Sequence, residues 1–387
     1  MKKHTKHTKL VKQNIGEFGR NEWAIIGTVC SDIQRLSKQI ISELKTDYKI
    51  AYVDADHRNF SESENENESE NWSKSALDFG ASLEYTDKID FHRFDEKRTL
   101  SKFQFRQYFN EQDGILINGN HFLGERQIVV IDARKEKSLE RKLDRLTNVT
   151  LFLLTEGETE IYPFLKNHLP NWQEIPTLKI NEIDKIIAFI NDELKANQPP
   201  LYGLILTGGK SVRMGKDKGL IDYHGKPQRE YLVDLLSNYC EKIFLSCRKA
   251  QISELENFNT IPDTFDDLGA FGGILSAFRN NPNVAWLVVA CDLPLINEKA
   301  ITELVQQQNP SKIATAFHNE ATNFPEPLIT IWQPRSYPVL LQFLAQGYAC
   351  PRKVLINSEI ETVQPSDVNF LKNVNKPEEY EAVLKLL

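Results

Sequence analysis

The sequence is poor in the features that mark zinc proteins, membrane proteins and nucleic-acid scaffolds. Its 387 residues include only five cysteines, and no Cys or His spacing is that of a zinc site. No apolar run approaches the roughly eighteen residues of a membrane span, and the basic start at residues 1–9 lacks the apolar core of a signal peptide. The net charge of −7 argues against a nucleic-acid scaffold. We therefore expect reduced thiols, a cytoplasmic location, and neither nucleic acid nor a membrane as a partner.

The length and the linker signals indicate two domains. A chain of 387 residues exceeds one ordinary hydrophobic core. Residues 196–200, Ala-Asn-Gln-Pro-Pro, are typical of a linker, because a proline pair stops a helix and stiffens the chain. We therefore expect a flexible tail at residues 1–20, a first domain at residues 21–195 and a second domain at residues 201–387. Within the first domain, residues 61–71 hold five glutamates and no apolar residue, which predicts a solvated, disordered loop.

Both domains alternate short apolar runs with helical spacing. The expected strands are residues 22–28, 48–54, 114–118, 127–132 and 149–155, followed by 201–206, 242–247, 284–290 and 313–317. The expected helices are residues 33–44, 181–195, 228–239, 297–308 and 377–387. This alternation predicts the α/β class, with a mostly parallel, doubly wound sheet in each domain.

The most specific motif is Leu-Thr-Gly-Gly-Lys-Ser-Val-Arg-Met-Gly-Lys-Asp-Lys, residues 206–218. An apolar strand runs into Gly208 and Gly209, whose backbone amides can approach phosphate oxygens closely because they carry no side chain. Four cations that follow supply charge to offset a triphosphate: Lys210, Arg213, Lys216 and Lys218. The motif predicts a phosphate-binding loop, and the alternative is an ordinary strand–loop turn with solvated lysines.

A second candidate residue lies at the end of an apolar strand in the segment Trp-Leu-Val-Val-Ala-Cys-Asp-Leu-Pro, residues 286–294. Asp292 stands at the carboxyl end of this strand, and ligands bind at that edge of a parallel sheet. Mg²⁺ bound to phosphates takes one or two carboxylates and otherwise water. Asp292 is therefore the predicted Mg²⁺ ligand, and the alternative is an aspartate that caps the next turn.

The loop motif resembles the signature of the molybdenum cofactor guanylyltransferases, Leu-Ala-Gly-Gly-x-x-x-Arg-Met-Gly-x-Asp-Lys. This chain departs from it only in Thr207, where the family has alanine. The match continues through residues 220–227, and the resemblance covers residues 201–387. It implies a Rossmann-like nucleotidyltransferase fold, which would transfer GMP from GTP to molybdopterin with Mg²⁺ and release pyrophosphate.

The resemblance also implies roles for single residues. Catalytic roles fall to Arg213, Lys218 and Asp292, with Asp292 as the metal ligand. Nucleotide binding falls to Leu206, Thr207, Gly208, Gly209, Lys218, Asp263 and Asp292.

Two further segments match the family in part. Asp263 precedes a loop in which Gly269, Gly272 and Gly273 are expected to let the chain pass under the base or ribose. Asn373 and Asn375 match a family Asn-Val-Asn-x-Pro-Glu-Glu segment and would contact phosphate or substrate; helix capping is the alternative. A departure lies at residues 246–248, Ser-Cys-Arg, where the family often has asparagine.

The order of elements in residues 21–195 resembles the small GTP-binding partner of molybdopterin-guanine dinucleotide synthesis, whose phosphate loop reads Gly-x-x-x-Ser-Gly-Lys-Thr. Here residues 27–34 read Gly-Thr-Val-Cys-Ser-Asp-Ile-Gln. Asp32 therefore replaces the glycine of the motif, Ile33 replaces its lysine, and Gln34 replaces the threonine whose hydroxyl binds magnesium. An acid in the anion-binding turn should repel a triphosphate. The prediction is a degenerate adaptor domain that docks the other domain or a client molybdoenzyme; the alternative is an unrelated α/β domain.

Other functions remain open from the sequence. They are transfer of CMP to molybdopterin, transfer of a nucleotide to a sugar phosphate, and a non-catalytic carrier of the cofactor. The presence of both Lys218 and Asp292 argues against a carrier, which needs neither a metal nor a triphosphate clamp.

Overall fold

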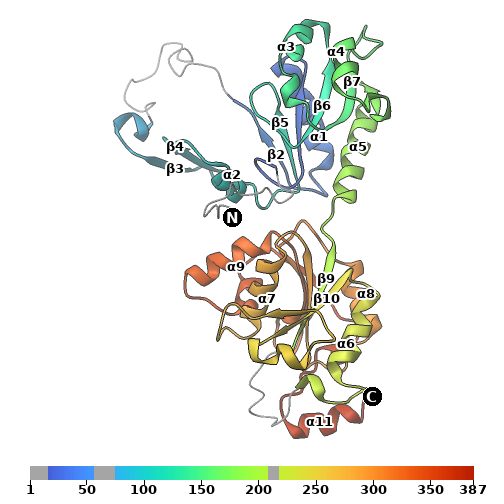
Figure 1. Cartoon of the computed structure of the whole chain (residues 1–387). Helices are drawn as coiled ribbons and strands as arrows, with labels where there is room; N and C mark the ends of the chain where they lie inside the picture. Colours follow the sequence, from blue (N-terminus) through green and yellow to red (C-terminus); the bar gives the residue numbers. More distant parts are fainter. Residues whose placement is uncertain (1–15, 56–74, 208–217) are drawn as a thin grey trace, which may run out of the picture. The chain divides into compact units, whose positions relative to one another are not determined.

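The structure of the protein, a computed structural model, describes residues 16–55, 75–207 and 218–387 (Figure 1). The predicted acidic loop at residues 61–71 lies outside the described residues. The chain divides into two compact units, Met1–Leu194 and Lys195–Leu387. In the described part of the chain, no helix is long and apolar enough to cross a membrane.

The N-terminal unit is built on a six-stranded parallel sheet with the order β2-β5-β1-β6-β7-β8. Its strands are β1 (Glu22–Ile26), β2 (Ile50–Val53), β5 (Gly114–Asn118), β6 (Arg126–Ile131), β7 (Val149–Leu154) and β8 (Thr177–Lys179). Its helices are α1 (Cys30–Leu44), α2 (Lys102–Tyr108), α3 (Glu136–Glu140), α4 (Pro163–His168) and α5 (Ile183–Ala196). A separate antiparallel ribbon joins β3 (Leu83–Asp87) to β4 (His92–Glu96).

Alternate residues of β1 pack into two hydrophobic cores, one on each face of the sheet. Trp23 and Ile25 pack with α1 and α5 on one face of the sheet, whereas Ile26 packs with α3 and α4 on the other. Successive side chains of a strand point to opposite faces, so a strand that is apolar throughout must be covered on both sides. The near-continuous apolar runs of the sequence thus have a packing explanation.

The packed part of this unit begins before residue 20. Phe18 is only 3% exposed, and its ring packs against Phe105 and Phe109. The buried carboxylate of Glu22 accepts hydrogen bonds from the amides of residues 17, 18 and 19. The prediction that the flexible tail extends to residue 20 is therefore wrong for residues 16–20, because one buried aromatic ring and one buried acid fix this segment.

The C-terminal unit is built on a seven-stranded sheet with the order β11-β10-β9-β12-β14-β13-β15. Its strands are β9 (Leu201–Leu206), β10 (Lys242–Cys247), β11 (Thr260–Pro262), β12 (Ala285–Ala290), β13 (Ala314–Asn319), β14 (Phe324–Trp332) and β15 (Glu361–Val363). Only β14 runs antiparallel to its neighbours in this sheet.

Helices cover both faces of this second sheet. They are α6 (Gln228–Ser237), α7 (Ala270–Asn280), α8 (Glu298–Gln306), α9 (Ser336–Ala345), α10 (Pro351–Ile356) and α11 (Pro377–Leu384). Helices α6 and α8 lie over one face, and α7 and α9 over the other (Figure 1). The predicted α/β class with two mostly parallel sheets is confirmed.

Candidate active site

The candidate site lies at the carboxyl edge of the parallel strands of the C-terminal sheet. Leu206, the last residue of β9, pairs with Ser246 of β10 on one side and with Ala290 of β12 on the other. Asp263 and Asp292 follow the last residues of β11 and β12. Parallel strands end at the same edge of a sheet, so the two carboxylates predicted from the sequence stand along one line of strand ends.

Lys218, Asp292 and Asn375 meet at this edge although they are far apart in the sequence. The Lys218 ammonium donates to Asn375 Oδ1 at 2.6 Å and lies 3.4 Å from Asp292 Oδ2. All three side chains are partly buried. The structure thus brings together a cation, a carboxylate and an amide, which is the set that the sequence singled out for binding phosphate and metal.

The segment that carries Asn375 is fixed from both sides. The amide of Val374 donates to the Asp292 carbonyl at 2.8 Å, and Val374 is 1% exposed. On the other side, Glu379 of α11 accepts from the amide of Asn375 at 2.6 Å. The helix begins at Pro377, as predicted, with Glu379 in its first turn. Capping and site formation are therefore not alternatives for this segment, because the capped helix holds the site amide in place.

One oxygen of the Asp292 carboxylate is available to bind a ligand or ion. Its Oδ1 atom is buried and has no hydrogen-bond partner among the described residues. A buried carboxylate oxygen left without a donor costs free energy unless a ligand or ion satisfies it. The arrangement fits one inner-sphere bond to a hard divalent cation that keeps water and phosphate oxygens as its other ligands. No group of three or more His, Cys, Asp or Glu residues in the described part of the chain forms an all-protein metal site.

Asp263 belongs to a hydrogen-bonded chain that links three strand ends. The Ser246 hydroxyl donates to Asp263 Oδ1 at 2.8 Å, and the Thr207 hydroxyl donates to the Ser246 carbonyl at 2.7 Å. Burial raises the pKa of the Asp263 carboxyl, the Ser246 hydrogen bond opposes this rise, and Asp266 adds to it. Ser246, which departs from the family residue, thus orients Asp263.

The glycines after Asp263 do not form the extended loop that we expected. Gly272 and Gly273 lie in α7 and are buried. A Cβ atom at Gly272 would meet the Phe265 carbonyl at 2.5 Å, and one at Gly273 would meet the Ser246 hydroxyl at 2.7 Å. These two glycines let the helix approach the edge of the sheet. Only Gly269, at φ 55°, adopts a backbone conformation that disfavours other residues.

Other predicted site residues are placed only in part. Gly208, Gly209 and Arg213, together with Lys210 and Lys216, lie outside the described residues. Asn373 is exposed. Its partner in the motif, Asn375, is the amide that contacts Lys218.

Sequence reasoning missed a buried charged pair on β14, the strand next to β12. Glu326 of β14 is 1% exposed and accepts a hydrogen bond from the Arg352 guanidinium of α10 at 3.0 Å. The signal was present in the sequence, because a glutamate inside the otherwise apolar run of residues 324–332 has to be paired when the strand is buried.

In the N-terminal unit, the corresponding edge is filled by its own side chains. Thr28 and Arg134 both bind the carboxylate of Asp132, and Arg134 also pairs with Asp32 at 2.6 Å. Burial alone would raise the pKa of Asp132, but hydrogen bonds from Arg134 and Thr28 outweigh it and hold the pKa below its ordinary value. Asp32, predicted to repel a triphosphate, is already neutralised by the protein.

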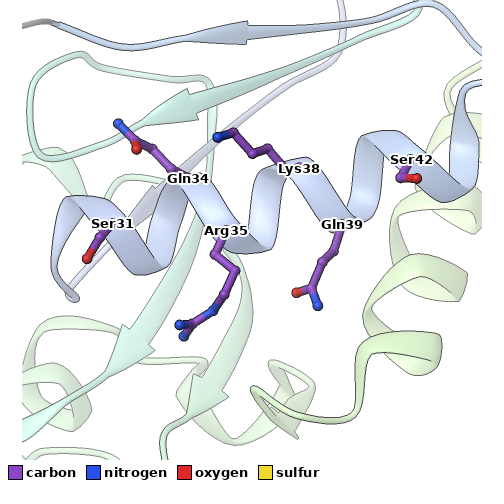
Figure 2. A pocket seen from close by; sticks show the side chains of 6 residues that line it. All are labelled: Ser31, Gln34, Arg35, Lys38, Gln39 and Ser42. Atoms are coloured by element: carbon purple, nitrogen blue, oxygen red, sulfur yellow. The ribbon is translucent and has the colours of Figure 1, made fainter.

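A hollow of about 390 Å³ lies along the exposed face of α1 in the N-terminal unit. Figure 2 shows the polar side chains that line it, all projecting from this one helix: Ser31, Gln34, Arg35, Lys38, Gln39 and Ser42. Arg35 is paired with Asp32 at 2.7 Å. The hollow contains no carboxylate, and we assign it no chemistry.

The match to a protein-family model falls in the C-terminal unit. Residues 203–362 match the MobA-like NTP transferase domain. The chain is 32% identical over 184 residues to the molybdenum cofactor guanylyltransferase of Vibrio atlanticus, covering 46% of this chain and 91% of that protein. It is 39% identical over 198 residues to a molybdenum cofactor biosynthesis bifunctional protein of Synechocystis, covering 51% of this chain but only 57% of that relative.

Among solved structures, a molybdopterin-guanine dinucleotide biosynthesis protein A from Archaeoglobus fulgidus is 19% identical. The match has a TM-score of 0.42 and covers 48% of this chain and 97% of that one.

Proposed function

This chain belongs to the MobA-like NTP transferases, and on that premise we propose that its C-terminal unit transfers GMP from GTP to molybdopterin. The domain match and the molybdenum cofactor guanylyltransferase relatives support this activity. The observation that carries the proposal is the meeting of Lys218, Asp292 and Asn375 at the carboxyl edge of the sheet. These residues supply a cation for phosphate, a carboxylate for a metal, and an amide that holds the cation.

In the proposed mechanism, GTP lies along the strand ends, with its base and ribose near Asp263 and its phosphates at the loop that begins with Gly208. A terminal phosphate oxygen of molybdopterin attacks the α-phosphorus in line. The new P–O bond forms as the bond to the β-phosphate oxygen breaks, and pyrophosphate leaves. Lys218 offsets charge that develops on the phosphates, and no side-chain nucleophile is needed. Positioning and charge stabilisation provide most of the rate enhancement in such reactions.

We assign the metal in this reaction to Mg²⁺, held by Asp292. Its unpaired Oδ1 is the oxygen available for the ion. When bound, Mg²⁺ neutralises phosphate charge and orients the polyphosphate.

The N-terminal unit is proposed to be an adaptor that binds no nucleotide. Its filled strand edge supports this role, because a triphosphate would have to displace the bonds between Arg134 and its two aspartates. The client of such an adaptor would be a molybdoenzyme in the cytoplasm.

The test is product analysis by mass spectrometry with molybdopterin, Mg²⁺ and equal concentrations of GTP, CTP and UTP. We expect the guanine dinucleotide, and a product containing CMP or UMP would replace the proposal with one of its alternatives. Asp292→Ala should lower pyrophosphate release by at least about a hundredfold. Asp234→Ala, at an exposed position of α6, is the matched control and should keep normal turnover.

A further inference from the structure

Glu326 lies on β14, the strand next to the one that leads to the site carboxylate. In the antiparallel register of β12 and β14, Val289 pairs with Ile329. Asp292 lies three residues after Val289 and Glu326 three residues before Ile329, so both lie beyond the same end of this paired segment. The electrostatics agree: burial raises the pKa of Glu326, and the charge of Asp292 contributes to that rise.

The carboxylate of Glu326 is occupied by partners from two further elements. Arg352 of α10 donates to its Oε2 at 3.0 Å, and the Asn319 amide of β13 approaches the same oxygen at 3.4 Å. Glu326 is therefore fixed in place and unavailable as a second metal ligand. Its ion pair holds the Arg352 guanidinium over β14, the strand next to β12.

Arg352 retains donors for a ligand. A guanidinium has five N–H donors, and Glu326 engages one nitrogen, Nη2. The Nε atom is buried and has no hydrogen-bond partner among the described residues, while the side chain as a whole remains 34% exposed. A planar guanidinium with free donors, held from one side by a carboxylate, is well suited to bidentate recognition of a phosphate.

The sheet order separates the two substrates. Asp263, which follows β11, lies on the β11-β10-β9 side of Asp292, whereas Glu326 and its partner Arg352 lie on the β14-β13 side. With the nucleotide on the first side, an in-line attack on its α-phosphorus requires the acceptor to approach from another direction. The strand on the far side of Asp292 is β14.

We infer that Arg352, positioned by Glu326, forms the subsite for the phosphate group of the acceptor. This inference rests on the proposed nucleotidyl transfer and adds the recognition of the second substrate. The ligand class is a phosphomonoester, whose oxygens can accept hydrogen bonds from the guanidinium donors that Glu326 does not use. Arg352 is a binding residue in this scheme, and Glu326 is a positioning residue.

Steady-state kinetics with the full-length chain test the inference, with GTP and molybdopterin varied separately. Arg352→Ala should raise the KM for molybdopterin about tenfold to a hundredfold and leave the KM for GTP within about twofold of the wild type. Arg352→Lys, which keeps the charge but loses the planar fork, should give an intermediate KM. Glu326→Gln should raise the same KM by a smaller factor. Lys353→Ala, at the exposed neighbouring position, is the matched control and should leave both KM values unchanged.

The outcomes separate the two claims. An active wild type whose Arg352→Ala variant keeps the acceptor KM, or loses affinity equally for both substrates, overturns the inference and leaves the proposed function standing. A wild type that makes no guanine dinucleotide refutes the proposed function itself. Direct titration of molybdopterin into the Arg352→Lys variant, monitored by pterin fluorescence, gives the acceptor affinity without turnover. An unchanged affinity there also counts against the subsite.

Discussion

The two sheets differ in how the polar side chains at their carboxyl edges are paired. In the N-terminal unit, Asp132 binds Thr28 and Arg134, and Arg134 reaches across to Asp32. In the C-terminal unit, Asp292 Oδ1 and Arg352 Nε are buried and unpaired among the described residues. Buried polar groups are normally satisfied, so the unpaired carboxylate oxygen of Asp292 at the strand edge indicates a place that a ligand completes. One α/β plan therefore supports a self-satisfied edge and an edge that needs a ligand.

The largest expected effect on the C-terminal edge comes from removing the ammonium group of Lys218. Lys218→Ala should lower kcat/KM for pyrophosphate release by about a hundredfold or more, because the proposed mechanism uses this ammonium to offset phosphate charge. The substitution also leaves the side-chain oxygen of Asn375 without its hydrogen-bond donor. The measurement is coupled pyrophosphate release. Lys226→Ala is the control, since the one partner of Lys226 among the described residues is the exposed Asp234. An effect of less than about twofold from Lys218→Ala would show that the cluster is structural.

A change at the N-terminal edge should affect stability and leave catalysis intact. Asp132→Asn replaces the carboxylate that binds both Thr28 and Arg134 with an uncharged amide. Thr28 is only 1% exposed, so water cannot replace a lost hydrogen bond there. We expect the N-terminal unit to lose about 1–3 kcal/mol of unfolding free energy, the usual cost of an unsatisfied buried group. Hydrogen exchange localises the loss, and Asp144→Asn, at an exposed position, is the control. A parallel fall in nucleotidyl transfer would contradict the adaptor assignment.

Asp132 also makes the stability of the N-terminal unit depend on pH in the acidic range. The pKa of Asp132 lies below its ordinary value in the folded protein. Its stabilising contribution is therefore complete above the ordinary carboxyl pKa of about 4, and it is lost as the pH falls through the lower folded value. In the Asn variant, the stability of this unit should depend less on pH in that acidic range.

The smallest expected effect concerns the pH dependence of GTP binding. Burial, with a contribution from Asp266, raises the pKa of Asp263, so this carboxyl takes up its proton at a higher pH than an exposed aspartate. The KM for GTP should therefore begin to rise at a higher pH during acidification than an ordinary carboxyl would cause. Asp266→Asn removes the like charge and should shift that rise to lower pH by a fraction of a unit. A pH profile that is the same in both proteins would remove Asp263 from the nucleotide site.

The sequence contained enough to predict the fold class and to single out the three residues that meet at the site, Lys218, Asp292 and Asn375. Apolar periodicity located the strand that ends before Asp292 and the helix that begins at Pro377, because burial on both faces and N-terminal capping leave local patterns. The packing role of Gly272 and Gly273 could not be predicted, since it depends on Phe265 and Ser246 approaching from other elements. The sequence did carry a signal for the burial of Glu326, but the place of its strand beside β12 could not be predicted, because β14 is an antiparallel strand inserted in a mostly parallel sheet.

The bond between Val374 and Asp292 also has a consequence for synthesis on the ribosome. Lys218 lies 74 residues before Asp292 and 157 residues before Asn375. The sheet can form once β15 has emerged, but the lysine gains its amide partner only after the segment at residues 373–379 has left the exit tunnel and docked. A released chain truncated before residue 373 would thus contain all seven strands of the sheet, but Lys218 would lack its amide partner and the Asp292 carbonyl its bond from Val374.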